Sequence, residues 1–429
     1  MHTLLYHFSP LLTFISLYLG SGLYFAWHGV DMAFYQISPV VAILPALILA
    51  WYLQSGSTTT TMNRFLDGAR HRDIITMCFI FMLAGALGVV TKQIGCVDAT
   101  INLALYLVPA RFLLIGIFIA AAFIATAIGT SLGTIATIAP IAAELATQGA
   151  FPMALGMATV VGGAMFGDNL SLISDTTIAA VMSQGADWRK KLWLNGIIAG
   201  IASIITILIL LNVHDATVTL TSGSFSLIHL LPYLVLIGLA VAGVNVFVVL
   251  ISSLACAGII GISMSNYSIL ALSQDIAHGF ASMHEITVLS LLVGGLSGLL
   301  STGIAQLQRS LSNTKQHAPK PRTAQLATAW IVSLFDALIA NNTIAIIFCG
   351  DIVKELNQAA RVPAHYTAAW LDIFSCVVQG IIPYGAQILL ASSIGGVSPL
   401  AVSASVYYCY VLSAVAIVYI LTNKQRLHA

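Results

Sequence analysis

The stretch FGDNLSLISDTT, residues 166–177, places two carboxylates and five further oxygen-bearing side chains between apolar segments. The apolar residues before it (151–166) and after it (192–211) indicate membrane-spanning helices. A carboxylate at the middle of a membrane costs at least about 2.5 kcal/mol, so two in one motif, Asp168 and Asp175, indicate a functional site. The alternative, an ordinary water-facing loop, needs a short helix over residues 178–183 that ends at the membrane surface.

The composition of the whole chain is that of a membrane protein. Of its 429 residues, 59% are apolar and 7% are charged, whereas soluble domains carry about 25% charged residues. We therefore expect an all-α polytopic protein of the bacterial inner membrane, in contact with lipid. The net charge is +1 and the basic residues are scattered, so no nucleic-acid partner is expected. The six cysteines form no CxxC pair, and no cofactor is expected.

Apolar segments that are long enough, or nearly long enough, to cross a membrane recur along the chain. They cover residues 11–27, 38–53, 74–90, 111–128, 132–147, 151–166, 192–211, 227–242, 245–261, 286–300, 324–340, 343–356, 366–382 and 400–421. With the N-terminus inside the cell, fourteen of the sixteen Lys and Arg residues fall in cytoplasmic loops, and only Lys92 and Arg111 lie outside. Because loops rich in basic residues stay in the cytoplasm, both termini are predicted to be cytoplasmic.

The two halves of the chain, residues 1–213 and 214–429, show the same order of segments. Each has three spans, a helix pair joined by a tight polar turn, a span interrupted by polar residues, and a closing span. We interpret each half as five crossings with a re-entrant helical hairpin and a broken transmembrane helix. An odd number of crossings predicts inverted-topology repeats. Whether the pairs at 111–147 and 324–356 are re-entrant or cross fully stays open, and the parity is the same in both cases.

Four polar interruptions mark where the chemistry of the repeats is expected. The hairpin tips are residues 127–134 and 340–343, and the helix breaks are residues 167–177 and 380–387. Backbone groups freed at membrane depth are tolerated only where they are buried in protein or line a wet cavity. Helix N-termini at such a place suit an anion, whereas carbonyl, carboxylate and hydroxyl oxygens suit a hard cation.

The second half supplies the candidate substrate-binding residues. From its turn and its break these are Asn341, Asn342, Thr343, Pro383, Tyr384 and Gln387. Uncharged amides and backbone N–H groups can hold an organic carboxylate while the first half holds a cation. Asp336 and Asp372 lie in the flanking spans. Each is either a functional carboxylate or a structural one whose hydrogen bonds are made within the protein. Both are kept as candidates for this site.

The motif FGDNLSLISDTT resembles the FGDxxSPxSDTT signature of the NhaC-type sodium/proton antiporter family, and GTSLGT, residues 129–134, is similar to its GTSxGT turn. The turn ANNT, residues 340–343, resembles the hairpin tip of the broader ion-transporter superfamily, which includes divalent-anion/sodium symporters. The resemblance implies a homodimer with a scaffold and a moving transport domain. It implies sodium at Asp168 and Asp175, with further ion ligands at Thr130, Ser131, Asn169, Ser171, Ser174 and Thr176. The chain departs from the family at Leu172, where the signature has proline, and at Tyr384-Gly385.

Two transport functions fit these residues. The first is sodium/proton antiport, in which Asp168 and Asp175 bind sodium and protons in alternation. The second is sodium- or proton-coupled symport, or exchange, of a small amino acid or carboxylic acid. An intramembrane aspartyl protease needs two aspartates on different helices and leaves the two-half symmetry unexplained, and duplicated breaks suit alternating access better than a passive channel. We therefore expect a transporter and not an enzyme, with sodium, protons and lipid as its partners.

Overall fold

The structure is a computed structural model that describes residues 2–28, 30, 36–54, 56–96, 99, 103, 109–171, 174–213, 226–242, 244–264, 267–312 and 319–422. Throughout these residues the regular secondary structure is helical. Two residues of the acidic motif, Leu172 and Ile173, lie outside the described residues, as does most of the polar loop between the two halves. The all-helical architecture agrees with the expected fold class.

The first half of the chain begins with four helices and continues with a hairpin, an interrupted helix and a closing helix. The first four are α1 (His2–Trp27), α2 (Pro39–Tyr52), α3 (Thr58–Ala69) and α4 (Arg72–Gln93). After the short η2 (Ala110–Phe112) follow α6 (Leu113–Ile128), α7 (Ser131–Thr147), α8 (Met153–Leu170), α9 (Asp175–Gln184) and α10 (Trp188–Val213).

The second half also has four helices before a hairpin. After the short η3 (Leu227–Leu230) come α11 (Leu231–Val241), α12 (Val246–Met264), α13 (Ile269–Ser282) and α14 (His284–Ser312). The hairpin, the interrupted helix and the closing segment are α15 (Pro321–Ile339), α16 (Asn342–Ala359), α17 (Ala364–Gln379), α18 (Ala386–Gly395), α19 (Pro399–Ser405) and α20 (Tyr407–Thr422).

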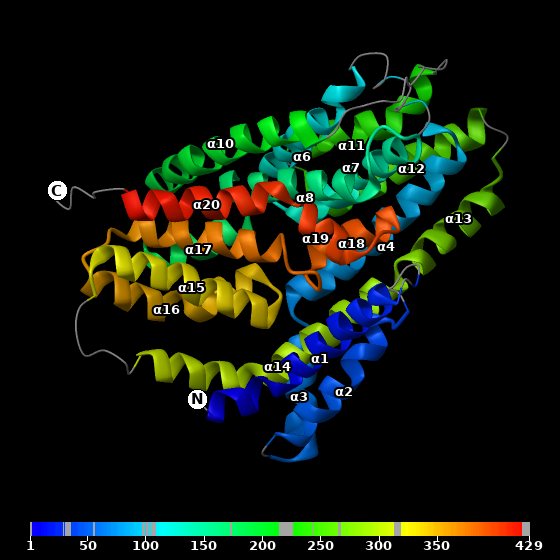
Figure 1. Ribbon diagram of the computed structural model, residues 1–429. Helices are drawn as coiled ribbons and strands as arrows, with labels where there is room; N and C mark the ends of the chain where they lie inside the picture. The colour runs from blue at the N-terminus through cyan, green and yellow to red at the C-terminus, as the bar shows by residue number, and fades with distance from the viewer. Residues whose placement is uncertain are drawn as a thin grey trace.

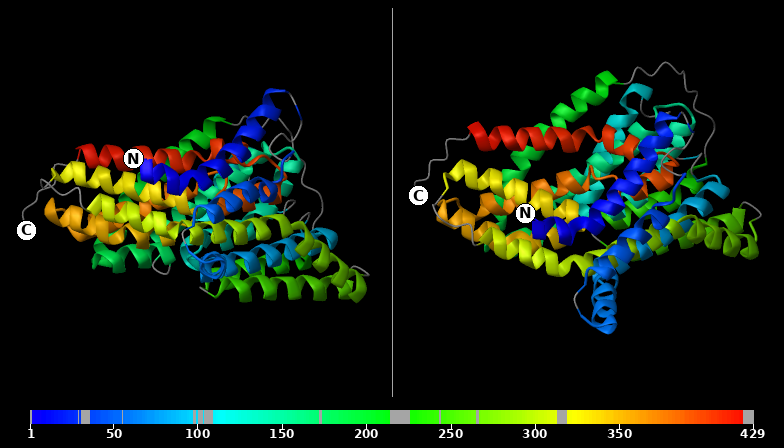
Figure 2. Two further views of the ribbon diagram at one scale, coloured as in Figure 1. Left: turned by 90° about the horizontal axis from the view of Figure 1, so that it is seen from below. Right: turned by 60° about the horizontal axis from the view of Figure 1, so that its bottom comes forward.

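In space the helices form two groups. The hairpin group consists of α6–α10 and α15–α20, whose long helices run side by side in Figure 1, with α7, α8 and α18 near its centre. The lateral group consists of α1–α4 and α11–α14, in which α14 packs against α2, α3 and α4. Figure 2 shows the blue and yellow-green helices of the lateral group lying along one side of the molecule. Both groups therefore contain helices from both halves of the chain.

Elements at matching places in the two halves make matching contacts. Helix α3 packs against α14, and α13 packs against α4; likewise α9 packs against α16, and α18 against α7. Two of these contacts are between backbones. A Cβ atom added to Gly68 would lie 2.1 Å from the carbonyl oxygen of Gly294, and one added to Gly279 would lie 2.4 Å from the Cα atom of Ala86. Glycine is required at both places because the helices approach too closely for any side chain.

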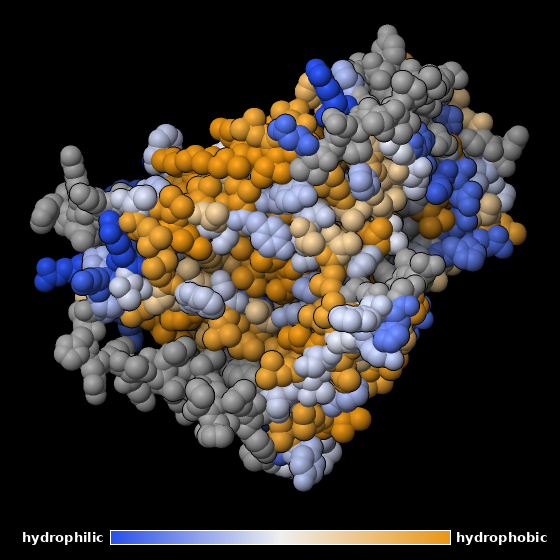
Figure 3. All heavy atoms as spheres, viewed as in Figure 1, coloured by the Kyte–Doolittle hydropathy of each residue, from blue (hydrophilic) through white to orange (hydrophobic). Residues whose placement is uncertain are grey.

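The outer surface suits lipid. Apolar residues cover much of the face seen in Figure 3, and hydrophilic residues gather toward its ends. Among the described residues, α4, α10, α12 and α14 are long and apolar enough to cross a membrane, and the bent pair α18–α19 adds a fifth candidate by length and composition. Shorter apolar helices occur in α1, α2, α6, α7, α11 and α20. The chain is a multi-pass membrane protein.

Three features of the fold differ from the sequence interpretation. Helices α3 and α13 lie between predicted spans, and each begins at a serine cap: Ser57 Oγ accepts from the Thr60 N–H and Ser268 Oγ from the Ala271 N–H. The segment predicted as one span over 400–421 is divided at Val406 into α19 and α20. Finally, α18 and α19 meet at an angle of 111°. Short polar caps and bends of this kind produce no apolar periodicity, so hydropathy alone does not show them.

Candidate ion-binding site

The tip of the first hairpin is a tight turn between α6 and α7. Gly129 ends α6 in the left-handed conformation, with φ of 77°, and its N–H donates to the Ala125 carbonyl at 2.8 Å. Thr130 is extended, and α7 begins at Ser131. Glycine adopts a positive φ without steric cost, so this turn can reverse the chain within two residues. The unpaired N–H groups at the start of α7 consequently lie at the tip.

The tip of the second hairpin has the same geometry with different residues. Ala340 ends α15 with φ of 54°, a conformation that costs a non-glycine residue about 1–2 kcal/mol. Asn341 is extended and caps α16, its side-chain oxygen accepting from the Ile344 N–H at 3.0 Å. Helix α16 begins at Asn342. Strain at a position equivalent to Gly129 is typical of a functional turn held by its surroundings.

The interruption in the first half is shorter than the sequence interpretation of residues 167–177. Helix α8 continues to Leu170, and α9 begins at Asp175, with extended conformations at Ser171 and Ser174. Asp168 therefore lies in the last turn of α8 and Asp175 in the first turn of α9, one on each side of the break. The start of a helix stabilises a negative charge, which suits Asp175.

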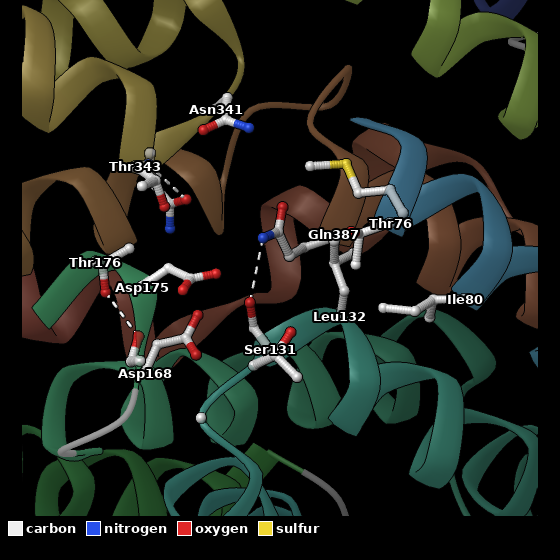
Figure 4. Close-up of a pocket in the computed structure, with 15 residues that line it drawn as sticks. Thr76, Ile80, Ser131, Leu132, Asp168, Asp175, Thr176, Asn341, Thr343 and Gln387 are labelled. Atoms are coloured by element: carbon white, nitrogen blue, oxygen red, sulfur yellow. Dashed lines mark hydrogen bonds between the residues drawn. The ribbon is translucent and has the colours of Figure 1, made fainter. Parts of the chain in front are cut away.

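These segments surround one cavity of about 80 Å³. Of the predicted residues, those that line it are Thr130, Ser131, Asp168, Ser174, Asp175, Thr176, Asn341, Asn342, Thr343 and Gln387. Helix α4 of the lateral group completes the wall with Thr76, Met77 and Ile80. In Figure 4 the carboxylates of Asp168 and Asp175 point into the space between the two hairpin tips. The structure thus brings residues of both halves to one place between the hairpin group and the lateral group.

Polar contacts around the cavity connect the halves. The Gln387 Nε2 donates to Ser131 Oγ at 3.2 Å, and Ser131 lines the cavity together with Asp168. Ser174 Oγ and Thr176 Oγ1 lie 2.9 Å apart. Asp168 is buried, and its Oδ1 has no hydrogen-bond partner among the described residues. An unpaired carboxylate oxygen that faces a polar cavity is available to a cation.

Six of the predicted site residues do not line this cavity: Asn169, Ser171, Pro383, Tyr384, Asp336 and Asp372. Asn169 is buried, and its Nδ2 donates to the Met165 carbonyl within α8. The Tyr384 hydroxyl donates to the Ala337 carbonyl at 2.7 Å and so holds the second break against α15. For these residues a direct role in binding stays a prediction.

Asp372 belongs to a buried ion pair with Lys191, a residue that the sequence analysis counted as a cytoplasmic charge. Both side chains are fully buried, and Lys191 Nζ lies 2.5 Å from Asp372 Oδ2. The ammonium also donates to Thr177 Oγ1 at 2.7 Å. Asn195 Nδ2 donates to Asp372 Oδ2 at 2.8 Å and to the Asn169 carbonyl at 3.0 Å.

This network fixes both ends of the first helix break, at Asn169 and at Thr177, onto α10 and α17. Lys191 and Asn195 are four residues apart, a spacing that places them on one face of a helix. That spacing is the one signal in the sequence that could have shown Lys191 facing the protein, while its neighbour Lys190 is exposed.

Two larger cavities, each of about 280 Å³, lie along α4 on either side of the candidate site. One is lined by His71 and Ile74 near the start of α4, with Asn341 of the second tip. The other is lined by Gly85, Gly88 and Lys92 near the end of α4, where Lys92 Nζ lies 3.5 Å from Glu144 Oε2. The three cavities therefore follow one helix in order, with the two carboxylates at the middle one.

Comparison with known proteins yields one family match. Residues 3–214 match the model described as the Na+/H+ antiporter family. No curated protein matches the chain. A solved structure, that of the YdaH transporter from Alcanivorax borkumensis, is similar over 95% of this chain and 100% of its own, with 16% identity and a TM-score of 0.43. A TM-score this low does not establish a common fold. The family match supports a transporter and not an enzyme.

Proposed function

We propose that the chain is an NhaC-type secondary transporter that exchanges sodium for protons by alternating access. The observation that carries this proposal is the cavity in which Asp168 and Asp175 meet both hairpin tips. Its polar lining consists of carboxylate, hydroxyl, amide and backbone groups, the donors that a hard cation prefers. The two aspartates bind sodium as carboxylates and protons as carboxylic acids, so each cation excludes the other.

The size of the cavity favours an ion over an organic solute. A water molecule needs about 10–15 Å³ measured in the same way, so 80 Å³ accommodates a sodium ion with a few waters. Binding sites for small organic molecules usually measure about 300–1,000 Å³. Sodium bound here would replace its lost hydration with oxygens from both halves of the protein.

Alternating access is supported by the two groups of helices and by the cavities along α4. With both termini in the cytoplasm, the cavity at His71 opens toward the inside and the cavity at Lys92 toward the outside. A shift of the hairpin group along α4 would connect the central site with one cavity at a time. The matching contacts of the halves support inverted-topology repeats, which give the two end states similar packing.

The family resemblance also supports a homodimer in the bacterial inner membrane, in which the lateral group is the scaffold. We propose this arrangement together with the transport function. Chemical cross-linking of the protein in native membranes tests it, and a monomer as the sole species would contradict the dimer.

The second candidate function is sodium- or proton-coupled movement of a small amino acid or carboxylic acid. One observation favours it: the amides of Asn341, Asn342 and Gln387 line the same cavity as the carboxylates. A bare antiporter does not require these uncharged groups, whereas an organic carboxylate would accept hydrogen bonds from them.

Replacing Asp175 tests the sodium site. Sodium or lithium should raise the thermal stability of the purified wild type, by up to about 2.7 kcal/mol at a hundred times the dissociation constant. Asp175→Asn should lose most of this response because an amide carries no negative charge. Asp351→Asn is the control, since Asp351 is exposed on α16 and does not line the cavity. A full sodium response in Asp175→Asn would place the ion elsewhere.

Replacing Asn342 separates the two candidate functions. In proteoliposomes, sodium-driven proton exchange should stay within a few-fold of wild type in Asn342→Ala, because the two carboxylates remain. Loss of sodium-dependent uptake of an amino or carboxylic acid in the same variant would instead support the second function. Folded yield is checked first by size-exclusion chromatography, because an unsatisfied hairpin tip can unfold.

A further inference from the structure

The central cavity, which holds the candidate sodium site, adjoins the cavity near the start of α4, here called the inner cavity. Asn341 at the second hairpin tip lines both, and it is the only described residue that does so. On α16 the central lining ends at Thr343 and the inner lining begins at Ile344. On α4 the inner lining reaches Ile74 and the central lining begins at Thr76. On both helices, therefore, less than one turn separates the two cavities.

A much thicker layer separates the central cavity from the cavity near the end of α4, here called the outer cavity. In the part of the chain that the structure describes, these two cavities have no lining residue in common. On α7 the central lining ends at Leu132 and the outer lining begins at Pro140, a distance of about 12 Å along the helix. On α18 the corresponding residues are Gln387 and Ser393. Between them lie fully buried apolar residues of two helices that pack together: Ile135, Ala136, Ala139, Ile388 and Leu390.

The Asn341 side chain is held in place by a local hydrogen bond. It is buried, and its Oδ1 accepts from the Ile344 N–H at 3.0 Å. The backbone before it is anchored, because the Ala340 carbonyl accepts from Gln379 Nε2 at 3.2 Å. In Figure 4 Asn341 and Asp168 lie on opposite sides of the central cavity. The side chain can therefore turn away from the wall of the cavity by giving up its cap, while the backbone of the tip stays where it is.

We propose that Asn341 is the inner gate of the sodium site, and that the structure is the inward-facing end state with this gate closed. The proposal rests on the proposed function and names the residue that a cation passes between the site and the inner cavity. Rotation of this one side chain opens the site to the inside. Access from the outside instead requires the whole hairpin group to shift along α4. Beyond the gate, the hydroxyl-bearing Ser297 and Ser301 line the inner cavity and can contact a hydrated ion.

The strength of the cap sets how often the gate opens. A helix cap of typical strength keeps the side chain in place in all but about one molecule in six. Asn341→Ala removes both the cap and the side chain that closes the wall, so access from the inside should become about fivefold faster. Asn341→Ser should show the same rise, because serine caps a helix equally well but lacks the amide group. Loosening of α16 alone would instead affect the alanine variant and spare the serine variant.

The test uses the full-length protein without its six native cysteines, with Thr76→Cys as reporter, because of the three cavities Thr76 lines only the central one. The small cation 2-aminoethyl methanethiosulfonate is added to right-side-out or inverted membrane vesicles. Free cysteine trapped on the far side consumes reagent that crosses the membrane. The reporter should react from the side on which Arg70→Cys reacts, and not from the other side. Ile347→Ala, which widens only the inner cavity, is the matched control and should keep the rate of the unmodified tip.

The outcomes separate the gate from the proposed function. Reaction of the reporter from the opposite side, or from neither side, overturns the inward-facing state. An unchanged rate in Asn341→Ser, or an equal rise in Ile347→Ala, overturns the role of Asn341. If Asn341→Ala does not fold, Asn341→Ser decides the proposal alone. The thiol reaction needs no sodium, so a protein that shows the expected reaction pattern without any sodium response would contradict the proposed exchange and support the gate.

Discussion

At the scale of single residues, the helix break of the first half depends on a charge that lies outside the cavity. The Lys191 ammonium bridges Asp372 of the second half and Thr177 of the first, and all three side chains are buried. A buried ion pair does not by itself add stability, because both charges lose their hydration. This ion pair instead fixes a position, because Lys191 holds the start of α9, and with it Asp175, against α17.

Lys191→Met should destabilise the protein by about 3–5 kcal/mol, because it leaves the Asp372 carboxylate buried without its partner. Thermal unfolding in detergent measures the loss. Lys190→Met is the matched control, since Lys190 is the exposed neighbour on the same helix turn. The double variant Lys191→Met/Asp372→Asn should recover much of the stability. Equal stability of Lys191→Met and Lys190→Met would show that the ion pair contributes nothing.

At the scale of elements, the lateral group is held together by backbone contact between helices. Gly68 of α3 meets Gly294 and Gly298 of α14, and Gly279 of α13 meets Gly85 of α4. Small residues let membrane helices approach closely where apolar burial gives little driving force, since lipid is as apolar as the helices. These glycine contacts join helices of the two halves. They also fix the position of α4, which forms one wall of the candidate site.

Gly68→Ala should separate α3 from α14, because its Cβ would lie 2.1 Å from a backbone oxygen that cannot move alone. We expect a loss of about 1–3 kcal/mol, as for overpacked cores. The control is Gly200→Ala on α10, where a Cβ meets no atom within 4 Å and the helix gains up to about 1 kcal/mol. Melting temperatures in detergent compare the two. A Gly68→Ala variant as stable as Gly200→Ala would contradict the close contact.

At the scale of the whole molecule, orientation decides which cavity faces which side of the membrane. The distribution of Lys and Arg predicts that Arg70 and Arg361 are cytoplasmic and Lys92 is outside. The structure exposes all three side chains, so each can be replaced by a reporter.

Single cysteines at these positions, in a background without the six native cysteines, test the orientation in intact cells. A membrane-impermeant maleimide should label Lys92→Cys. It should label Arg70→Cys and Arg361→Cys only after the cells are opened. Reaction of either arginine position from outside would reverse the orientation and exchange the roles of the two outer cavities.

Much of the fold and part of the site follow from the sequence alone. Apolar segments of spanning length, the order of segments in the two halves, and the turns at Gly129 and Asn341 depend on local composition and on local hydrogen bonds. The same is true of the acidic motif, because two carboxylates within an apolar region stand out against a low background of charge. These local patterns predicted ten residues that line the cavity.

Only the tertiary structure decided which polar groups meet. Lys191 pairs with Asp372 across 181 positions of sequence, and Gln387 reaches Ser131 across 256. Hydropathy and spacing describe one helix at a time. From them we predicted two sites, a cation site in the first half and a polar site in the second, whereas one cavity holds residues of both. They also placed Lys191 in a loop. In the folded chain both hairpin tips and both breaks converge. The physical reason is that charges and polar groups at membrane depth must find partners, and for Lys191, Asn195 and Gln387 a partner lies in the other half.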